Sequence, residues 1–247
     1  MKLATYNIWE SPAGMPHRFN QIIEEILSLD TDILCLQEVA DIEMHNELAS
    51  KGQFSFEHYQ ATAGVSIFSH FPIIATRDCE FATSTLLQLE RKTLFVTNLH
   101  LPWKSALSRE RAIVNIIEQT ENIVADYTLL VGDFNCSENS SVHQFLLGDR
   151  SLMERDAYFF DLAEAYAQIS GEPPKATLNF KENPRWGTVE PYNTVQVNQR
   201  FDRILLKNPY PKATPHLERC DIFGTQISAA SGLAASDHYG VFVILNF

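Results

Sequence analysis

The 247-residue chain contains few cysteines, few basic residues and no long hydrophobic run. Its four cysteines lie far apart and form no Cys-x-x-Cys pair, at Cys35, Cys79, Cys136 and Cys220. This spacing argues against a structural zinc site and predicts reduced thiols in a cytoplasmic protein. No segment reaches the roughly 18 apolar residues that a membrane helix needs, and the residues after Met1 form no signal-peptide hydrophobic region. We therefore expect no membrane association.

Acidic residues outnumber basic ones by 31 to 19, which leaves a formal net charge of −12. Proteins that wrap long duplex DNA gain most of their affinity from lysine and arginine contacts to phosphates. The charge therefore argues against that function, but it is compatible with a small or single-stranded phosphate ligand. It also suits a divalent cation, because such an ion offsets clustered carboxylates. No feature of the sequence indicates an obligate protein partner.

Strand-like and helix-like segments alternate along the chain, and 45% hydrophobic residues can form a substantial core. Apolar runs predict strands over residues 2–9, 33–36, 56–61, 65–69, 74–87, 94–99, 128–131, 176–180, 200–207, 217–223 and 239–245. Helical spacing predicts a helix from Pro16 and others over 42–50, 107–126, near 142–146 and over 160–167, with a long polar loop over 181–199. We see no repeat and no linker. The pattern predicts one domain over residues 1–247, with two mixed β-sheets packed together and helices outside.

The most informative stretch is the apolar run over residues 128–131, which leads directly into Gly132-Asp133-Phe134-Asn135. A run without polar alternation suits a strand that is buried on both faces. Gly132 allows a sharp turn at the strand end, and Asp133 and Asn135 would then point to the same side. Alone, these residues could form a simple turn. Beside one another at a buried strand end, they could handle a water molecule and a phosphate oxygen.

Similar polar residues follow apolar runs at several other places in the chain. They are Asn7, Glu38, His100, Asp202, and Asp237 with His238. Each alone has a structural explanation, such as a turn, a helix cap, a core histidine or a surface ion pair. Active sites concentrate in loops at the ends of rigid elements, so the joint pattern carries more weight than any single member.

Together these fragments resemble the endonuclease/exonuclease/phosphatase superfamily, which has the DNase I-like fold. The fragments occur in the family's order: Thr5-Tyr6-Asn7-Ile8-Trp9, Leu36-Gln37-Glu38-Val39, Thr97-Asn98-Leu99-His100-Leu101, Gly132-Asp133-Phe134-Asn135, Arg200-Phe201-Asp202-Arg203-Ile204 and Ser236-Asp237-His238. The resemblance covers nearly the whole chain. It implies a four-layer α/β/β/α sandwich and Mg²⁺-dependent hydrolysis of phosphoesters, with Mn²⁺ as a substitute ion.

The resemblance also implies a metal site. Glu38 would be the principal Mg²⁺ ligand, and Asn7 and Asp237 would complete the site directly or through water. The metal would polarise a phosphoryl oxygen and stabilise the leaving alkoxide.

The remaining motif residues would act on the phosphate and the water. Asp133 would hold or deprotonate the attacking water, and Asn135 would donate to the phosphate. Asp202 would fix the tautomer of His238, which serves as base or as phosphate donor. His100 would be a second phosphate ligand or a general acid. The choice between Asp133 and His238 as the base stays open at this point.

Within the family, the C-terminal third is most similar to the 5′-tyrosyl-DNA phosphodiesterase branch, through Arg200 to Ile204 and Ser236 to Gly240. Two positions depart from that branch. It has Thr-Trp-Asp where this chain has Thr177-Leu178-Asn179, and His-Leu-Glu-Ser where this chain has His100-Leu101-Pro102-Trp103. The departures concern substrate recognition and leave the catalytic residues in place.

Three function classes follow. The first is a nuclease or a phosphodiesterase that processes nucleic-acid ends, with Trp103, Lys104 and Trp186 as candidate substrate contacts through base stacking and charge. The second is a hydrolase of a small phosphate ester or a phospholipid headgroup, which the acidic charge favours. The third is a binding module that retains the fold without catalysis, which the complete set of catalytic residue types disfavours.

Overall fold

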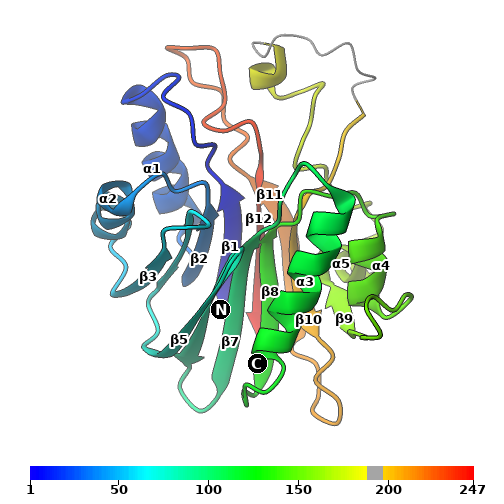
Figure 1. Cartoon of the computed structure of the whole chain (residues 1–247). Coiled ribbons are helices and arrows are strands. Elements are labelled where there is room, and N and C mark those ends of the chain that lie inside the picture. Colours follow the sequence, from blue (N-terminus) through cyan, green and yellow to red (C-terminus); the bar gives the residue numbers. More distant parts are fainter. Residues whose placement is uncertain (188–196) are drawn as a thin grey trace.

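A computed structural model describes residues 1–187 and 197–247. The chain forms two six-stranded mixed sheets that pack face to face, with helices on the outer faces (Figure 1). Sheet 1 has the order β11-β12-β1-β2-β4-β3 and sheet 2 the order β5-β6-β7-β8-β10-β9. The predicted fold class and the four-layer α/β/β/α arrangement are therefore confirmed.

The strands of sheet 1 are β1 (Lys2–Asn7), β2 (Ile33–Gln37), β3 (Phe56–Gln60), β4 (Val65–Ser69), β11 (His216–Phe223) and β12 (Gly240–Asn246). Those of sheet 2 are β5 (Ile73–Cys79), β6 (Ala82–Gln88), β7 (Thr93–His100), β8 (Tyr127–Asp133), β9 (Phe159–Asp161) and β10 (Asp202–Lys207). The helices are α1 (His17–Leu29), α2 (Ile42–Gly52), α3 (Ala106–Thr120), α4 (Ser141–Leu147) and α5 (Leu162–Ser170), with a short 3₁₀ helix over Pro184–Gly187.

The central strands are buried on both faces, which explains their continuous apolar sequences. In β8, Leu129 and Val131 point into the core between the two sheets, whereas Leu130 joins the separate core under α3 and α4. The helices α1 and α2 cover the other outer face, where Phe19, Ile22 and Ile26 pack against sheet 1. Each sheet therefore has helices on one side and its partner sheet on the other.

Two predicted boundaries are wrong. The segment predicted as a strand over 74–87 is a hairpin, because the chain turns at Glu80 and Phe81 between β5 and β6. The helix predicted over 107–126 ends at Thr120, and Val124 is 90% exposed instead of lining the buried face. Neither turn contains a glycine or a proline that would mark it in the sequence.

The C-terminal half contains smaller differences. The helix predicted over 160–167 begins as the edge strand β9, and the carboxylate of Asp161 then caps α5 by accepting from the amide of Ala163 at 3.0 Å. The strand predicted over 176–180 is reduced to one bridge between Leu178 and Gln199. Part of the loop predicted over 181–199 lies outside the described residues.

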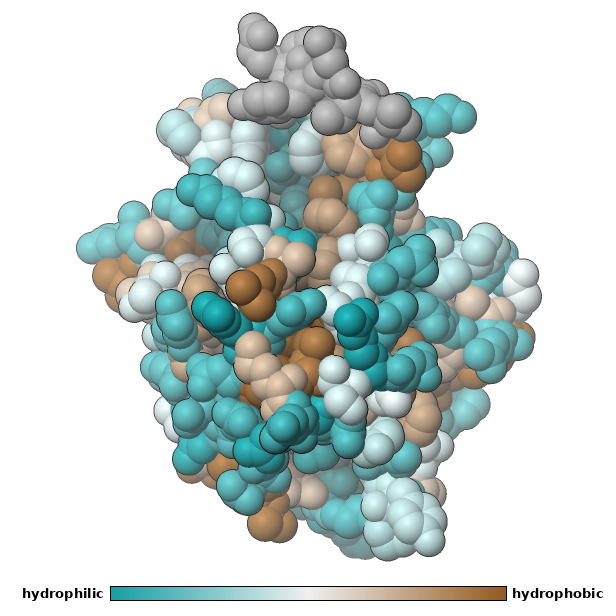
Figure 2. Space-filling view, turned by 45° about the vertical axis from the view of Figure 1, so that its right-hand side comes forward, coloured by the Kyte–Doolittle hydropathy of each residue, from teal (hydrophilic) through white to brown (hydrophobic). Residues whose placement is uncertain are grey.

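The face of the molecule in Figure 2 is mainly hydrophilic, and its hydrophobic residues form separate small groups. Within residues 1–187 and 197–247, no helix has both the length and the hydropathy required to cross a bilayer.

A polar bridge crosses the core between the sheets. Gln37 Nε2, at the end of β2, donates to Asn98 Oδ1 of β7 at 2.6 Å. Asn98 Nδ2 donates in turn to the carbonyls of Leu36 and Ser66 in sheet 1, both at 2.9 Å. Because buried polar groups are costly without partners, these directional contacts hold the two sheets in one alignment.

The glycine at position 132 is required by a close approach between two strands. Its φ is +130°, and a Cβ atom placed there would lie 2.0 Å from the backbone oxygen of Leu99. We expect Gly132→Ala to lower the free energy of unfolding by roughly 3 kcal/mol or more, because β7 and β8 must separate. Urea unfolding of the variant measures this loss. Gly171→Ala is the control, since its φ is +76° but no atom lies within 4 Å of the added Cβ, and we expect a loss of about 1 kcal/mol.

The carboxyl of Glu25 should make stability depend on pH. Burial raises its pKa from 4.5 to about 7, and Tyr6 donates a hydrogen bond to it at 3.1 Å. The folded state thus binds the proton more tightly, so its advantage is complete below pH 4.5 and is lost as the pH rises through 7. Between pH 5 and 8 we expect the wild type to lose roughly 3 kcal/mol more stability than Glu25→Gln. Denaturant titrations at both pH values measure this, with the exposed Glu90→Gln as the control. An equal pH dependence in Glu25→Gln would contradict the prediction.

Candidate active site

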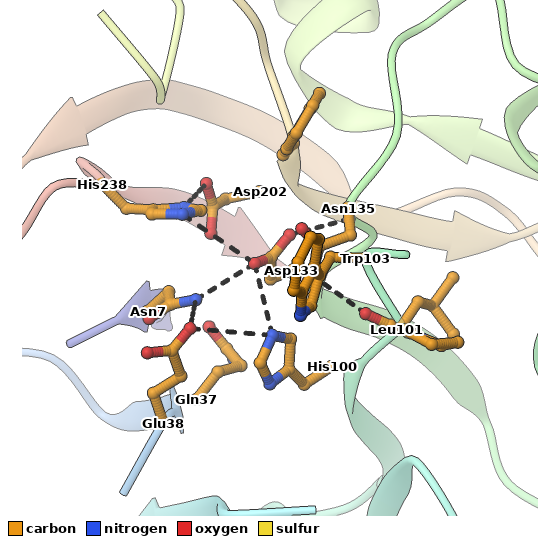
Figure 3. Close-up of polar contacts among 12 residues, drawn as sticks. Asn7, Gln37, Glu38, His100, Leu101, Trp103, Asp133, Asn135, Asp202 and His238 are labelled. Carbon is orange, nitrogen blue, oxygen red and sulfur yellow. Dashed lines mark hydrogen bonds and ion pairs between the residues drawn. The ribbon is translucent and has the colours of Figure 1, made fainter. Parts of the chain in front are cut away.

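Most of the polar residues predicted at strand ends come together at one edge of the sandwich, opposite the two chain termini (Figures 1 and 3). In sheet 2, strand register aligns three of them, because His100 pairs with Asp133 and Asp133 pairs with Asp202. In sheet 1, Asn7 and Gln37 end the parallel strands β1 and β2 side by side. The site therefore consists of two rows of strand ends that face each other.

The centre of this arrangement is the buried carboxylate of Asp133. Its Oδ2 accepts from Asn7 Nδ2 at 3.0 Å and lies 3.6 Å from His100 Nε2 and 4.0 Å from His238 Nε2. Its Oδ1 accepts from the backbone amide of Asn135 at 2.7 Å. One carboxylate thus meets donors from both sheets.

A buried carboxylate–imidazole pair lies next to Asp133. His238 Nδ1 is 2.9 Å from Asp202 Oδ2, so the other ring nitrogen points into the site (Figure 3). Burial alone would lower the pKa of His238, but the charge and hydrogen bond of Asp202 outweigh it, and Asp133 and Asp237 add to them. The pKa of His238 is consequently raised well above its ordinary value. The pair is arranged to keep this imidazole charged and correctly oriented.

Glu38 occupies a strained turn directly after β2. Its φ is +60°, a conformation that is uncommon for residues other than glycine and that concentrates at functional sites. Its Oε1 accepts from Asn7 Nδ2 at 2.9 Å, and its Oε2 accepts from the amide of Glu10 at 2.6 Å. Trp9 and Asn135, which flank the same site, also have positive φ values of 60° and 48°.

Glu38 and Asp237 have the chemistry of a hard-cation site. Burial raises the pKa of Asp237, His238 opposes that shift, and the negative charge of Glu38 raises the pKa further. Two carboxylates that repel each other are a fitting pair for a divalent ion. Asn7 is placed differently, because its Nδ2 bridges Glu38 and Asp133 while its Oδ1 accepts from the amide of Trp9 at 2.9 Å. Its direct ligation of a metal stays a prediction.

Two other clusters within the described part of the chain have ligand atoms close enough to hold an ion. One consists of Asp133, Asp202 and His238, and it overlaps the site. The other consists of His143, Asp161 and Glu164, whose two carboxylates are already bound by Arg200 at 2.7 and 3.1 Å. The ligand set predicted from the sequence is neither of these.

The predicted substrate contacts differ in exposure. Trp103 is 69% exposed next to the site, and Lys104 Nζ lies 5.2 Å from the centre of its ring. Trp186 is instead packed against Phe180, with the ring centres 4.4 Å apart. Asn135 has one amide hydrogen committed, since its Nδ2 donates to the carbonyl of Leu101 at 2.9 Å, and the second hydrogen can serve a ligand.

Several residues that position the site escaped the sequence analysis. Arg18 is buried and donates to backbone carbonyls on both sides of the site, including Ile8 at 2.6 Å and Ala235 at 3.2 Å. Asn183 donates to the carbonyls of Ser236 and Asp237 at 2.9 and 3.2 Å. Arg185 Nε donates to the Ala234 carbonyl at 2.7 Å. No local motif marks these residues, because their partners are backbone groups far away in the sequence.

The fold and the site define a phosphoesterase of the DNase I-like type. Residues 4–238 match the model of the Endonuclease/Exonuclease/phosphatase family, and the chain belongs to this family of metal-dependent phosphoesterases. No curated protein sequence matches the chain.

Solved structures with the same fold span nearly the whole chain. TDP2 from D. rerio, complexed with a single-stranded DNA product, has a TM-score of 0.80 and 14% identity, covering 100% of this chain and 99% of its own. A protein of unknown function from Enterococcus faecalis has a TM-score of 0.71 and 20% identity, covering 99% of both chains. SmcL has a TM-score of 0.71 and 14% identity, covering 100% and 99%. At these identities the likeness establishes the fold alone.

Removal of Glu38 should weaken binding of a divalent ion. We expect Mg²⁺ or Mn²⁺ to raise the stability of the wild type by about 1.4 kcal/mol at ten times the dissociation constant, and to do so much less in Glu38→Ala and Asp237→Asn. Thermal unfolding across a metal titration measures this. The exposed Glu47→Gln on α2 is the control and should respond like the wild type. An undiminished metal response in both site variants would rule out these ligands.

Proposed function

We propose that the protein is a metal-dependent phosphodiesterase that acts on ends or single strands of nucleic acid. The observation that carries this proposal is the placement of Asp133 between two imidazoles, one of which is oriented by Asp202. Asn7 joins Asp133 to Glu38, whose charge also acts on Asp237. In-line hydrolysis of a phosphodiester needs a positioned water and donors around the phosphoryl oxygens. Asp133 can position that water, and His100 and His238 can supply donors to the phosphoryl oxygens.

Asp133 is the group that we assign to the attacking water. Its Oδ2 is held by the amide of Asn7 and can accept the proton that the water loses. His238 is less suited to that task, because Asp202 favours its charged form, in which both ring nitrogens are donors. We therefore assign the Nε2 hydrogen of His238 to a phosphoryl oxygen.

His100 and Asn135 complete the phosphate site. His100 Nε2 lies 3.6 Å from Asp133 and 3.8 Å from Glu38, a position from which it can donate to the phosphate or to the leaving oxygen. Asn135 contributes its remaining amide hydrogen. A cation held by Glu38 and Asp237 would supply Lewis acidity toward a phosphoryl oxygen and the leaving group.

The choice of nucleic acid rests on charge and on structural likeness. A net charge of −12 disfavours extended duplex contacts, whereas an end or a short single strand needs few cationic contacts. The similar fold of TDP2, whose structure contains a single-stranded DNA product, supports the same class of substrate. Reduced thiols and a cytoplasmic location remain part of this proposal.

A second candidate is hydrolysis of a small phosphate ester or a phospholipid headgroup. The acidic charge favours it, because a small ester or a headgroup presents only one or two phosphate charges to be repelled, whereas a nucleic-acid strand presents many.

A hydrolysis panel separates the two candidates. It contains a 5′-blocked single-stranded oligonucleotide, an abasic duplex and a simple aryl phosphodiester, each with Mg²⁺. We expect the wild type to cleave the single strand and Glu38→Ala and His238→Ala to lose that activity. Turnover of the aryl diester alone would shift the substrate to small molecules, and no turnover despite metal binding would refute the proposed function.

The pairing of Asp202 with His238 should matter for kcat. We expect Asp202→Asn to lower kcat by about 10² to 10⁴, since an orienting carboxylate becomes neutral while its shape is kept. Steady-state kinetics with the cleaved substrate measures the effect, and thermal unfolding checks that the variant is folded. Asp78→Asn, which removes an exposed carboxylate paired with His58, should leave kcat unchanged. A wild-type kcat in Asp202→Asn would remove this pair from the mechanism.

A further inference from the structure

The loop between β7 and α3 has an unusually well-anchored backbone. The amide of Leu101 donates to the Asp133 carbonyl, and the Leu101 carbonyl accepts from Asn135, both at 2.9 Å. Arg109 Nη1 donates to the carbonyls of Pro102 and Trp103 at 3.2 and 2.8 Å. The ring of Pro102 restricts the backbone further. Three successive carbonyls of the loop are therefore held by side-chain donors.

The side chain on this anchored loop is nevertheless left in solvent. Trp103 is 69% exposed, although tryptophan is normally among the more buried residues. The other two tryptophans have internal partners, since the guanidinium groups of Arg18 and Arg185 lie over the Trp9 ring and Trp186 packs against Phe180. An indole that contributes little to the core, on a backbone that is fixed, is suited to contact a ligand.

The position of this indole relates it to the phosphate site. Leu101 is hydrogen-bonded to both Asp133 and Asn135, and Trp103 follows two residues later, a span of at most about 7 Å. Figure 3 includes Trp103 among the residues drawn at this site. A group attached to a phosphate bound by Asn135 and His238 is thus within reach of the ring.

The ammonium group of Lys104 indicates which kind of substrate group would bind next to the phosphate. Lys104 Nζ lies over the Trp103 ring, 5.2 Å from its centre, which places a positive charge on one face of the indole in an acidic protein. An aromatic ring with an adjacent cation matches a ligand in which a flat ring and a phosphate are linked, as in a nucleotide.

We propose that Trp103 and Lys104 form a nucleobase subsite, in which the base next to the scissile phosphate stacks on the indole and Lys104 contacts the adjoining phosphate. This inference rests on the proposed function and specifies which part of the substrate is recognised. It makes Trp103 a specificity-determining residue and not a catalytic one.

Insertion of the loop into a lipid surface is the competing interpretation. Leu107, four residues after Trp103, is 51% exposed, and two exposed apolar side chains at that spacing could enter a membrane interface. Stacking of a base requires Trp103 alone, whereas insertion uses both side chains. Leu107→Ala is therefore the matched control.

The test uses two short single strands that differ only at the nucleotide next to the scissile phosphate, which carries either a base or an abasic tetrahydrofuran. We expect Trp103→Ala to lower kcat/KM by about tenfold or more on the base-bearing strand and to have little effect on the abasic strand. Trp103→Phe should recover most of the loss, and Leu107→Ala should match the wild type. An equal loss on both strands, or no loss on either, would overturn the subsite.

Binding to catalytically inactive protein gives a second readout that does not need turnover. In the Glu38→Ala background, we expect Trp103→Ala to weaken affinity for the base-bearing strand but not for the abasic one. This binding result would support the subsite even if the wild type cleaves neither strand. Absence of cleavage by the wild type would refute only the proposed function. Binding to phosphatidylcholine vesicles that both Trp103→Ala and Leu107→Ala abolish would assign the loop to a lipid surface and overturn the subsite.

Discussion

Strand register in sheet 2 is the constraint on which the site depends. His100, Asp133 and Asp202 belong to three neighbouring strands and lie directly opposite one another, so their spacing follows from backbone hydrogen bonding and not from flexible loops. A slip of one residue would turn each side chain to the other face of the sheet. The contact between Gly132 and Leu99 secures this register, because only a residue without a side chain permits the approach.

The strands of sheet 1 position Asn7, Glu38 and His238, and polar contacts align this sheet with sheet 2. The Gln37–Asn98 bridge lies beneath the site, and Asn7 joins Glu38 to Asp133 across the interface between the sheets. Arg18, Asn183 and Arg185 then hold the two backbone segments that carry Asn7 and His238. The site thus contains four carboxylates and the neutral or cationic donors around them; the carboxylates are those of Glu38, Asp133, Asp202 and Asp237. Their mutual repulsion costs free energy, and a bound cation would reduce it.

Much of the fold and of the candidate site could be predicted from the sequence, for a physical reason. Buried strands produce continuous apolar runs, and a polar residue at the end of such a run is conspicuous, as at Asn7, Glu38 and Asp133. The turn at Glu80 and the end of α3 could not be predicted, since no glycine or proline breaks the chain at either place and Val124 extends the apolar spacing of α3. Arg18 and Asn183 were missed because a side chain that binds distant carbonyls has no characteristic neighbours in sequence. Asn98 lies inside a recognisable motif, but only the packing of the sheets reveals its partners.

The pairing of β1 has a consequence for how the protein matures. β1 lies between β2 and β12, and Ser236 binds the carbonyl of Asn7 at 2.7 Å, so residues from near both ends of the sequence meet at the site. During synthesis, sheet 1 lacks a central strand until residues 236–246 have emerged, and Asp202 has no imidazole partner until then. A growing chain therefore contains most of the acidic groups but not the assembled site. The catalytic pair of Asp202 and His238 would therefore be complete only after residues 236–246 have been made.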